Sequence, residues 1–246
     1  MAENVEVRQR EGVQDIIFDR VDKKNALTLQ MYGDAAEALR KAAQDDDIRA
    51  VVISGKGGHF TSGNDLMDFM KDPPTDESSP VFQFLMALRD CPCPVLAAVD
   101  GYAIGIGTTM LLHCDLAWSS DEARFRMPFV ELGLVPEAGS SVVIPALAGH
   151  RKAAELLYFG DFFDAATAKE TGIVNDVIEG DVISYARKRA RQLAQKPPEA
   201  LALTKQLLRN TDDDAVVAAM HREAEIFVER LQSQEFMQAV AKFQRS

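Results

Sequence analysis

Two glycine-containing turns and one carboxylate carry the chemistry of this sequence. The first turn spans residues 60–66 and the second spans residues 101–107. Each follows a predicted strand and precedes a predicted helix, so each can present backbone N–H groups at a helix start, where the helix dipole adds positive potential. Two converging N–H donors form an oxyanion hole, which stabilises a negative oxygen as it develops. Glu137, in the apolar run at residues 134–139, is the candidate that moves a proton.

Ser62 N–H and Ile106 N–H are the two predicted oxyanion donors. Gly63 follows Ser62 and lets the backbone turn sharply beside a ligand, because it has no Cβ to obstruct the approach. Gly105 and Gly107 flank Ile106 at a helix start. A single glycine turn more often only connects a strand to a helix. The pair, in this order and followed by a carboxylate, is more specific to a catalytic site.

Other cofactor and metal motifs are weak in this chain. Gly101, Gly105 and Gly107 do not reproduce the G-x-G-x-x-G dinucleotide fingerprint, and residues 55–58 lack the remaining elements of a phosphate loop. The four histidines are scattered without metal-ligand spacing, so we predict no metal. The cysteines at residues 91–94 are interrupted by prolines and have no matching pair, which favours neither a disulfide framework nor a zinc site.

Length and charge narrow the classes of function. With 246 residues and 47% hydrophobic content, the chain can bury a large core as one domain with an appendage. The formal charge of −11 argues against nucleic acid as a partner, because such binding requires basic surface. A phosphorylated small molecule is compatible with that charge, since Lys23, Lys24, Lys242 and Arg245 lie near the two chain ends, where folding could bring them together. We predict a cytoplasmic protein without a membrane segment, because no signal sequence and no apolar run of about eighteen residues is apparent.

The elements that must position the turns follow from hydrophobic periodicity. Apolar and polar residues alternate in two segments around Glu11 and Gly12, which predicts a hairpin. Strand, turn and helix then recur with the same polarity, which predicts a mostly parallel β/α core with its ligand site at the carboxyl ends of the strands. The predicted strands cover residues 5–10, 13–18, 50–54, 95–99 and 116–119, the predicted helices cover residues 28–44, 81–89 and 106–113, and residues 68–80 are predicted to be an exposed loop.

Beyond Pro136 the sequence is almost wholly helical in pattern. The apolar stripe at Val216, Met220, Phe227 and Leu231 favours either a subunit interface or packing on the chain's own core, with equal weight. The predicted helices cover residues 140–147, 150–159, 165–171, 182–195, 199–209 and 213–230.

The sequence resembles the crotonase superfamily, the enoyl-CoA hydratase/isomerase family, across nearly its whole length. The segments that carry the resemblance are residues 20–27, 60–66, 100–107, 114–115 and 133–136. The resemblance implies an α/β fold, a crotonase-like spiral of ββα units over residues 1–195. It also implies a C-terminal helical region for oligomerisation at residues 196–246, with assembly into homotrimers or dimers of trimers.

The resemblance further implies an acyl-CoA thioester as the substrate, so coenzyme A is part of the substrate and no separate cofactor is expected. The first segment and residues 62–66 would line the CoA path, and the two turns would hold the thioester oxygen. Dispersed apolar residues such as Leu66, Phe69, Phe82 and Leu85 would form the acyl pocket. The substrate-binding residues implied are Lys24, Ala26, Ser62, Gly63, Asn64, Asp65, Leu66, Ile106 and Lys242.

The chain departs from the hydratase pattern at two positions. Hydratases of the family activate water with two glutamates, and the matching positions here are Thr109 and Phe129, neither of which is an acid or base near neutral pH. Glu137 instead occupies the place of the catalytic glutamate in peroxisomal-type Δ3,Δ2-enoyl-CoA isomerases. Ile106 replaces the usual middle glycine of the second turn, but its backbone N–H remains. Glu131 is a competing candidate base.

An isomerase is therefore the predicted activity. A hydratase or another CoA-thioester reaction, such as dehalogenation or hydrolysis, is the alternative, because one oxyanion hole serves many chemistries. A non-catalytic acyl-CoA binder is the alternative of a different class.

Overall fold

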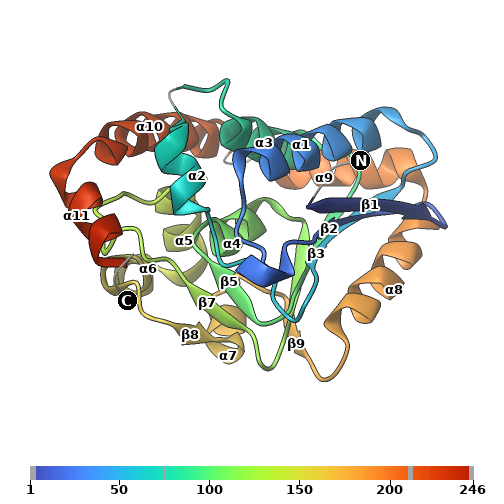
Figure 1. Cartoon of the computed structure of the whole chain (residues 1–246). Coiled ribbons are helices and arrows are strands. Elements are labelled where there is room, and N and C mark those ends of the chain that lie inside the picture. The colour runs from blue at the N-terminus through green and yellow to red at the C-terminus, as the bar shows by residue number, and fades with distance from the viewer. Residues whose placement is uncertain (1–3, 75, 210–212, 244–246) are drawn as a thin grey trace.

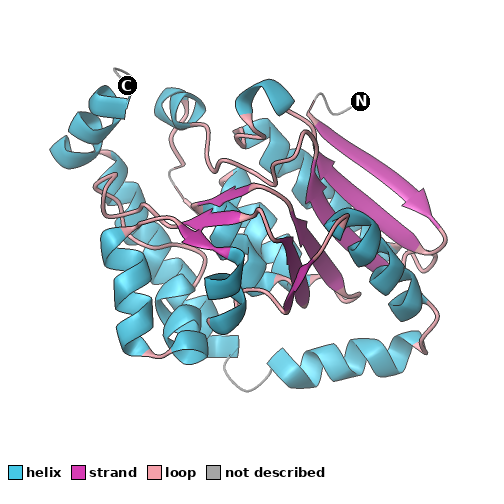
Figure 2. Ribbon diagram, turned by 90° about the horizontal axis from the view of Figure 1, so that it is seen from below, coloured by secondary structure: helices cyan, strands magenta, loops and turns pink. Residues whose placement is uncertain are grey.

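A six-stranded sheet forms the centre of the molecule (Figures 1 and 2). The structure is a computed structural model that describes residues 4–74, 76–209 and 213–243. The strand order is β1-β2-β3-β4-β6-β9, in which β1 and β2 are antiparallel and every later pair is parallel, as the sequence predicts. The strands are β1 (Val5–Arg10), β2 (Val13–Phe18), β3 (Ala50–Gly55), β4 (Val95–Val99), β6 (Leu116–Ser120) and β9 (Asp176–Ile178).

Helices cover the sheet and extend beyond it. Thr28 Oγ1 accepts a hydrogen bond from Met31 N–H at 3.3 Å and so caps the first helix, which confirms the predicted start. The helices are α1 (Leu29–Gln44), α2 (Leu66–Lys71), α3 (Pro80–Asp90), α4 (Ile106–Thr109), α5 (Ser140–Ala148), α6 (His150–Phe159), α7 (Ala165–Glu170), α8 (Val182–Ala194), α9 (Pro198–Arg209), α10 (Asp213–Leu231) and α11 (Gln234–Phe243), with 3-10 turns at Val21–Lys23 and Met110–His113.

The sheet is buried on both faces, because helices pack on each side of it and successive side chains of a strand point to opposite faces. In β3, Val51 and Ile53 join the main core, to which α1 and α3 contribute, whereas Ala50 and Val52 pack in a second core with α8. In Figure 1, α1 and α3 accordingly lie on one side of the sheet and α8 on the other. This double burial explains why the parallel strands are continuous apolar runs.

A small second sheet was not predicted from the sequence. It has the order β5-β7-β8, with strands β5 (Tyr102–Ile104), β7 (Arg124–Arg126) and β8 (Phe163–Asp164). Strands of two or three residues are too short to show a period of two, so the pattern contains no signal for them. The sheet matters for the site because β5 lies inside the second glycine turn.

The prediction of an exposed loop over residues 68–80 is wrong at its start. Asp65 accepts hydrogen bonds from the N–H groups of Met67 and Asp68, at 3.0 and 3.2 Å, and caps the short helix α2. Phe69 anchors this helix, because its side chain is buried in the main core. The polar composition of residues 68–80 predicts a loop, but it does not reveal that Asp65 caps a short helix at the start of this segment.

Helices α10 and α11 lie at one end of the molecule, where α10 packs against α5 (Figure 1). The predicted division into residues 1–195 and 196–246 stays a prediction. None of the described helices has both the length and the apolar content needed to cross a lipid bilayer.

Candidate active site

The two glycine turns lie side by side and are hydrogen-bonded to each other. Thr61 N–H donates to Tyr102 O at 2.8 Å, and Ile104 N–H donates to Thr61 O at 3.1 Å, which forms a parallel bridge between the turns. Gly63 has a φ of 93°, and a Cβ on it would lie 2.8 Å from Ile104 O. A side chain at this position is therefore excluded by sterics as well as by backbone conformation.

The structure corrects the first predicted oxyanion donor. Ser62 N–H donates to Lys24 O at 2.9 Å, so it is not available to a ligand, and the prediction of this donor is wrong. The N–H groups of Gly63 and Asp65 also donate within the protein. In the turn at residues 62–65, the backbone N–H of Asn64 is thus the one that has no acceptor among the described residues.

The second turn leaves the amide of Ile106 available. Gly105 N–H donates to Arg126 O at 2.8 Å, while the N–H groups of Thr108 and Thr109 both donate to Gly105 O. Ile106 is the first residue of α4, where a helical N–H has no intrahelical partner, and it meets no acceptor within the described part of the chain. Its role as the second donor stays a prediction that this geometry favours.

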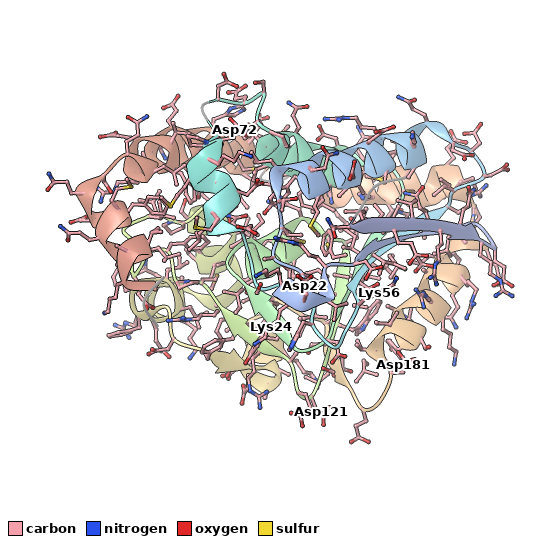
Figure 3. The ribbon with its side chains drawn as sticks, in the orientation of Figure 1. Asp22, Lys24, Lys56, Asp72, Asp121 and Asp181 are labelled. Atoms are coloured by element: carbon pink, nitrogen blue, oxygen red, sulfur yellow. The ribbon has the colours of Figure 1, made fainter. Side chains whose placement is uncertain are left out.

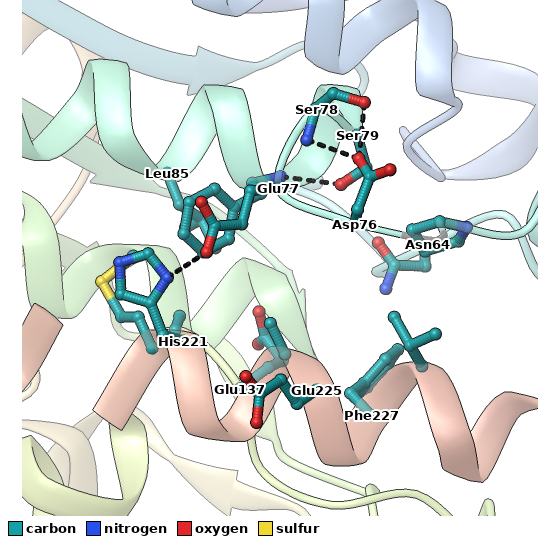
Figure 4. Close-up of a pocket in the computed structure, with 16 residues that line it drawn as sticks. Asn64, Asp76, Glu77, Ser78, Ser79, Leu85, Glu137, His221, Glu225 and Phe227 are labelled. Atoms are coloured by element: carbon teal, nitrogen blue, oxygen red, sulfur yellow. Dashed lines mark hydrogen bonds and ion pairs between the residues drawn. The ribbon is translucent and has the colours of Figure 1, made fainter. Parts of the chain in front are cut away.

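Glu137 and Asn64 line one cavity of about 690 Å³ (Figure 4). Glu137 lies on the segment that enters α5, and the Thr109 hydroxyl donates a hydrogen bond to its Oε1. Burial of the carboxyl group raises the pKa of Glu137 from its ordinary value of 4.5 to about 8. The hydrogen bond from Thr109 opposes this shift, and the negative charge of Glu223 adds to it. The result is a carboxyl group that can both take up and release a proton near neutral pH.

A histidine fixes the backbone directly after Glu137. Ala138 has a φ of 60°, which is unusual for a residue with a side chain, and its carbonyl oxygen lies 2.7 Å from His113 Nε2. Burial lowers the pKa of His113 to about 4, so the imidazole is neutral and donates from Nε2–H to this oxygen. His113 thus holds a strained residue in place next to the carboxylate.

Glu223 of α10 caps the helix that follows Glu137. Its carboxylate accepts hydrogen bonds from Gly139 N–H at 2.6 Å and from Ser141 N–H at 3.0 Å. The Ser140 hydroxyl adds a bond to Glu137 O at 2.6 Å. The C-terminal region therefore helps to build the site, beyond the oligomerisation role expected for it.

Tyr32 positions the side chain of Asn64 from α1. The Tyr32 hydroxyl donates to Asn64 Oδ1, and burial holds the pKa of this phenol well above its usual range, with a smaller contribution from Glu137. The phenol is therefore a permanent donor. Sequence reasoning missed Tyr32, His113 and Glu223, because each acts through a contact far along the chain.

The segment at residues 20–26, which is part of the predicted CoA path, contacts both glycine turns. Lys24, labelled in Figure 3, has a φ of 49°. Its ammonium group lies 4.9 Å from the centre of the Tyr102 ring. Ala26 O and the Asp65 carboxylate both accept hydrogen bonds from Arg20, at 3.0 and 2.7 Å, which ties the first segment to the first turn. This arrangement supports a ligand path, but CoA binding here remains a prediction.

The other predicted binding residues lie on α11 and α2 or outside the described residues. Lys242 is exposed on α11, and Arg245 lies outside the described residues, so the proposed meeting of the two chain ends stays a prediction. Leu66 begins α2 and is half-buried.

Two of the four residues predicted to form the acyl pocket line this cavity, and their contact with an acyl chain stays a prediction. Phe82 and Leu85 line the cavity with Glu137, whereas Leu66 and Phe69 are not among its lining residues. The competing base, Glu131, is exposed and pairs with Arg126. It does not line the cavity, which leaves Glu137 as the better candidate.

The fold is of the crotonase type. A sequence profile of the family "Enoyl-CoA hydratase/isomerase" matches residues 8–245. The chain belongs to this family.

Relatives within the family differ in reaction. The chain is 35% identical over 239 residues to "Enoyl-CoA delta isomerase 2" of Rattus norvegicus, covering 94% of this chain and 61% of that protein. It is 30% identical to "2,3-dehydroadipyl-CoA hydratase" of Escherichia coli, covering 90% of this chain and 88% of that protein. The solved structure of Pseudomonas aeruginosa OdaA is similar with a TM-score of 0.97 at 43% identity, covering 99% of this chain and 100% of that one. The chain thus spans about three fifths of the rat relative's length.

Proposed function

We propose that the protein is a Δ3,Δ2-enoyl-CoA isomerase, which moves the double bond of a 3-enoyl-CoA thioester to the 2-position. The observation that carries the proposal is the place of Glu137 in one cavity with Asn64, whose backbone N–H has no acceptor among the described residues. Burial raises the pKa of Glu137 to about 8, which suits it to move a proton in both directions. Thr109 and Phe129 stand where hydratases of the family carry two glutamates, so the usual pair that activates water is missing. The relative named as a delta isomerase agrees with this choice.

The reaction needs one base and one oxyanion hole. The Glu137 carboxylate removes a proton from C2, and the electron pair of that C–H bond passes into the thioester as a dienolate. The N–H groups of Asn64 and Ile106 donate to the developing negative oxygen. The neutral Glu137 then returns the proton to C4, the double bond forms between C2 and C3, and the thioester carbonyl is restored. No atom or electron is gained or lost, and the carboxylate is regenerated.

The oxyanion donors contribute as much as the base. Removing one such donor typically costs about 2.7–4 kcal/mol of transition-state stabilisation. The cavity also shields the carboxyl group from water, which strengthens each electrostatic interaction inside it. Both effects are in place before the substrate binds, so little reorganisation is needed.

The proposal includes self-association into homotrimers or dimers of trimers. Three leucines on α9, namely Leu203, Leu207 and Leu208, are 52%, 72% and 77% exposed, and neighbouring exposed apolar side chains are typical of protein–protein contact sites. Light scattering tests this part: a monomer at micromolar concentration would reject it.

The decisive experiment compares the wild type with Glu137→Gln on 3-hexenoyl-CoA. We expect the variant to lose at least about a thousandfold in kcat, within the range attributed to acid–base catalysis, while still binding a saturated acyl-CoA. Substantial isomerisation by the variant would reject Glu137 as the base. Rapid formation of 3-hydroxyacyl-CoA from a 2-enoyl-CoA would instead favour a hydratase. Binding without turnover of either thioester would favour an acyl-CoA binder.

A further inference from the structure

The cavity next to Glu137 has two different ends. In Figure 4, Asn64 lies at one end, Glu137 lies between, and a contact between Glu77 and His221 lies at the other end. His221 Nδ1 and Glu77 Oε1 are 2.6 Å apart, and this contact joins the segment before α3 to helix α10. The His221 ring also packs 5.2 Å from the ring of Phe82. A thioester held at Asn64 therefore directs its acyl tail past Glu137 toward Glu77 and His221.

The cavity combines apolar walls with negative charge. The carboxylates of Asp76, Glu77 and Glu225 line it, and Glu77 lies at the end opposite Asn64 (Figure 4). Among the lining residues that the structure describes, His221 is the only side chain able to carry a positive charge, and it already contacts Glu77. A cleft lined by charges of one sign with apolar walls focuses the electrostatic potential. The apolar walls are formed by Phe82, Leu85, Ala138, Met220, Ala224, Phe227 and Val228.

We propose that this arrangement, at the acyl-CoA site on which the proposed function rests, selects uncharged hydrocarbon tails and rejects tails that end in a carboxylate. A terminal carboxylate would meet carboxylates of the same charge and no lysine or arginine among the described lining residues. Rejection by an unpaired charge is a standard source of specificity. Because the Glu77 side chain is 64% exposed, dissolved salt screens its charge, and the discrimination should weaken as ionic strength rises.

The binding of saturated acyl-CoA thioesters, which have no double bond to move, tests this selectivity without relying on turnover. We expect octanoyl-CoA to bind at least about tenfold more tightly than suberoyl-CoA, the thioester of the same length with a terminal carboxylate, a difference of about 1.4 kcal/mol. Isothermal titration calorimetry at low salt measures both dissociation constants. Glu77→Gln and Glu225→Gln should each reduce the ratio about twofold to threefold, mainly by tightening suberoyl-CoA.

Glu229→Gln is the matched control, because Glu229 is exposed on the same helix, α10, but does not line the cavity. It removes the same charge and should leave the ratio unchanged. Circular dichroism verifies that each variant is folded, and the exposed Glu225 position gives a result even if Glu77→Gln disturbs its segment.

Two results would overturn the inference. The first is suberoyl-CoA binding to the wild type as tightly as octanoyl-CoA. The second is an equal change of the ratio of dissociation constants in the cavity variants and in Glu229→Gln. Such a result would show that the net charge of the protein, and not the cavity, causes the discrimination. Selective binding combined with no isomerisation of 3-octenoyl-CoA would leave the inference standing and reject the isomerase function, so the two failures are distinguishable.

Discussion

The Thr109 hydroxyl donates a hydrogen bond to the Glu137 carboxylate across 28 residues of sequence. This bond stabilises the ionised form, whereas burial of the same carboxyl group favours the neutral form, and burial has the larger effect. The proton affinity of the proposed base is therefore a balance between two opposing contributions. Changing either one should move the pH dependence of the reaction in a known direction.

The wild-type pH profile is the first test of this balance. Only the carboxylate form of Glu137 removes a proton, so kcat/KM should rise with pH and level off above its pKa of about 8. Initial rates on 3-hexenoyl-CoA between about pH 5 and pH 10 measure this rise of kcat/KM with pH, which is the acidic limb of the profile. A profile that is already flat at about pH 6 would show that the free enzyme holds Glu137 ionised there.

Thr109→Val should move the same limb to higher pH. The substitution removes the hydroxyl donor while preserving the shape of the side chain, so burial acts unopposed on Glu137. A hydrogen bond to a charged group is worth about 1.5–3 kcal/mol, which corresponds to a shift of roughly one to two pH units. Thr109→Ser retains the hydroxyl and serves as the control. An unchanged limb in Thr109→Val would contradict the role given to this bond.

Glu223→Gln should move the limb in the opposite direction. The charge of Glu223 raises the pKa of Glu137, although less than burial does, so its removal should lower that pKa. The amide also supplies one fewer oxygen to the N–H groups of Gly139 and Ser141. Leaving one buried donor unsatisfied costs about 1–3 kcal/mol, so the variant should also unfold at a lower temperature. A limb that shifts upward would reject the electrostatic coupling.

Gly63→Ala tests how closely the two turns approach. The added Cβ would lie 2.8 Å from Ile104 O at a φ of 93°, so both the contact and the backbone conformation are unfavourable. Gly58→Ala is the matched control, because its φ of 73° carries the strain without any atom near the new Cβ. We expect Gly63→Ala to be destabilised by about 1–3 kcal/mol more than the control and to lose most activity. Equal melting temperatures would remove the argument for a close approach.

Features that depend on residues close together in the chain can be predicted from the sequence. Strand, turn and helix recur in β3, β4 and the segments after them, and the apolar periodicity placed them correctly. Glu137 stood out because it is a lone carboxylate in an apolar run next to two glycine turns. These features are local, so the pattern contains them.

The wrong or missing site predictions concern contacts between segments that are far apart in the sequence. Nothing around Ser62 indicates that its N–H is taken by Lys24 O, and this contact leaves the Asn64 amide as the available donor. Glu223 and Gly139 are 84 residues apart, and His113 and Ala138 are 25 apart, so no spacing rule joins them. Such partners become visible only when the packing of α10 and of the turn at Met110–His113 is known.

The stability of Glu137→Gln provides a test that needs no substrate. In the unfolded chain this glutamate ionises near 4.5, but in the folded protein it ionises near 8, so the folded state binds more protons between these values. The unfolding free energy of the wild type should therefore fall as pH rises through this window, with the full loss reached above about 8. Glutamine does not titrate, so the difference in unfolding free energy should move in favour of the variant as pH rises through this window, by up to about 5 kcal/mol in total. Thermal melts at several pH values measure the difference, and Glu131→Gln, which changes an exposed glutamate, is the control. A difference between wild type and Glu137→Gln that stays constant with pH would mean that the folded protein does not perturb this carboxyl group, and the proposed proton transfer would lose its physical basis.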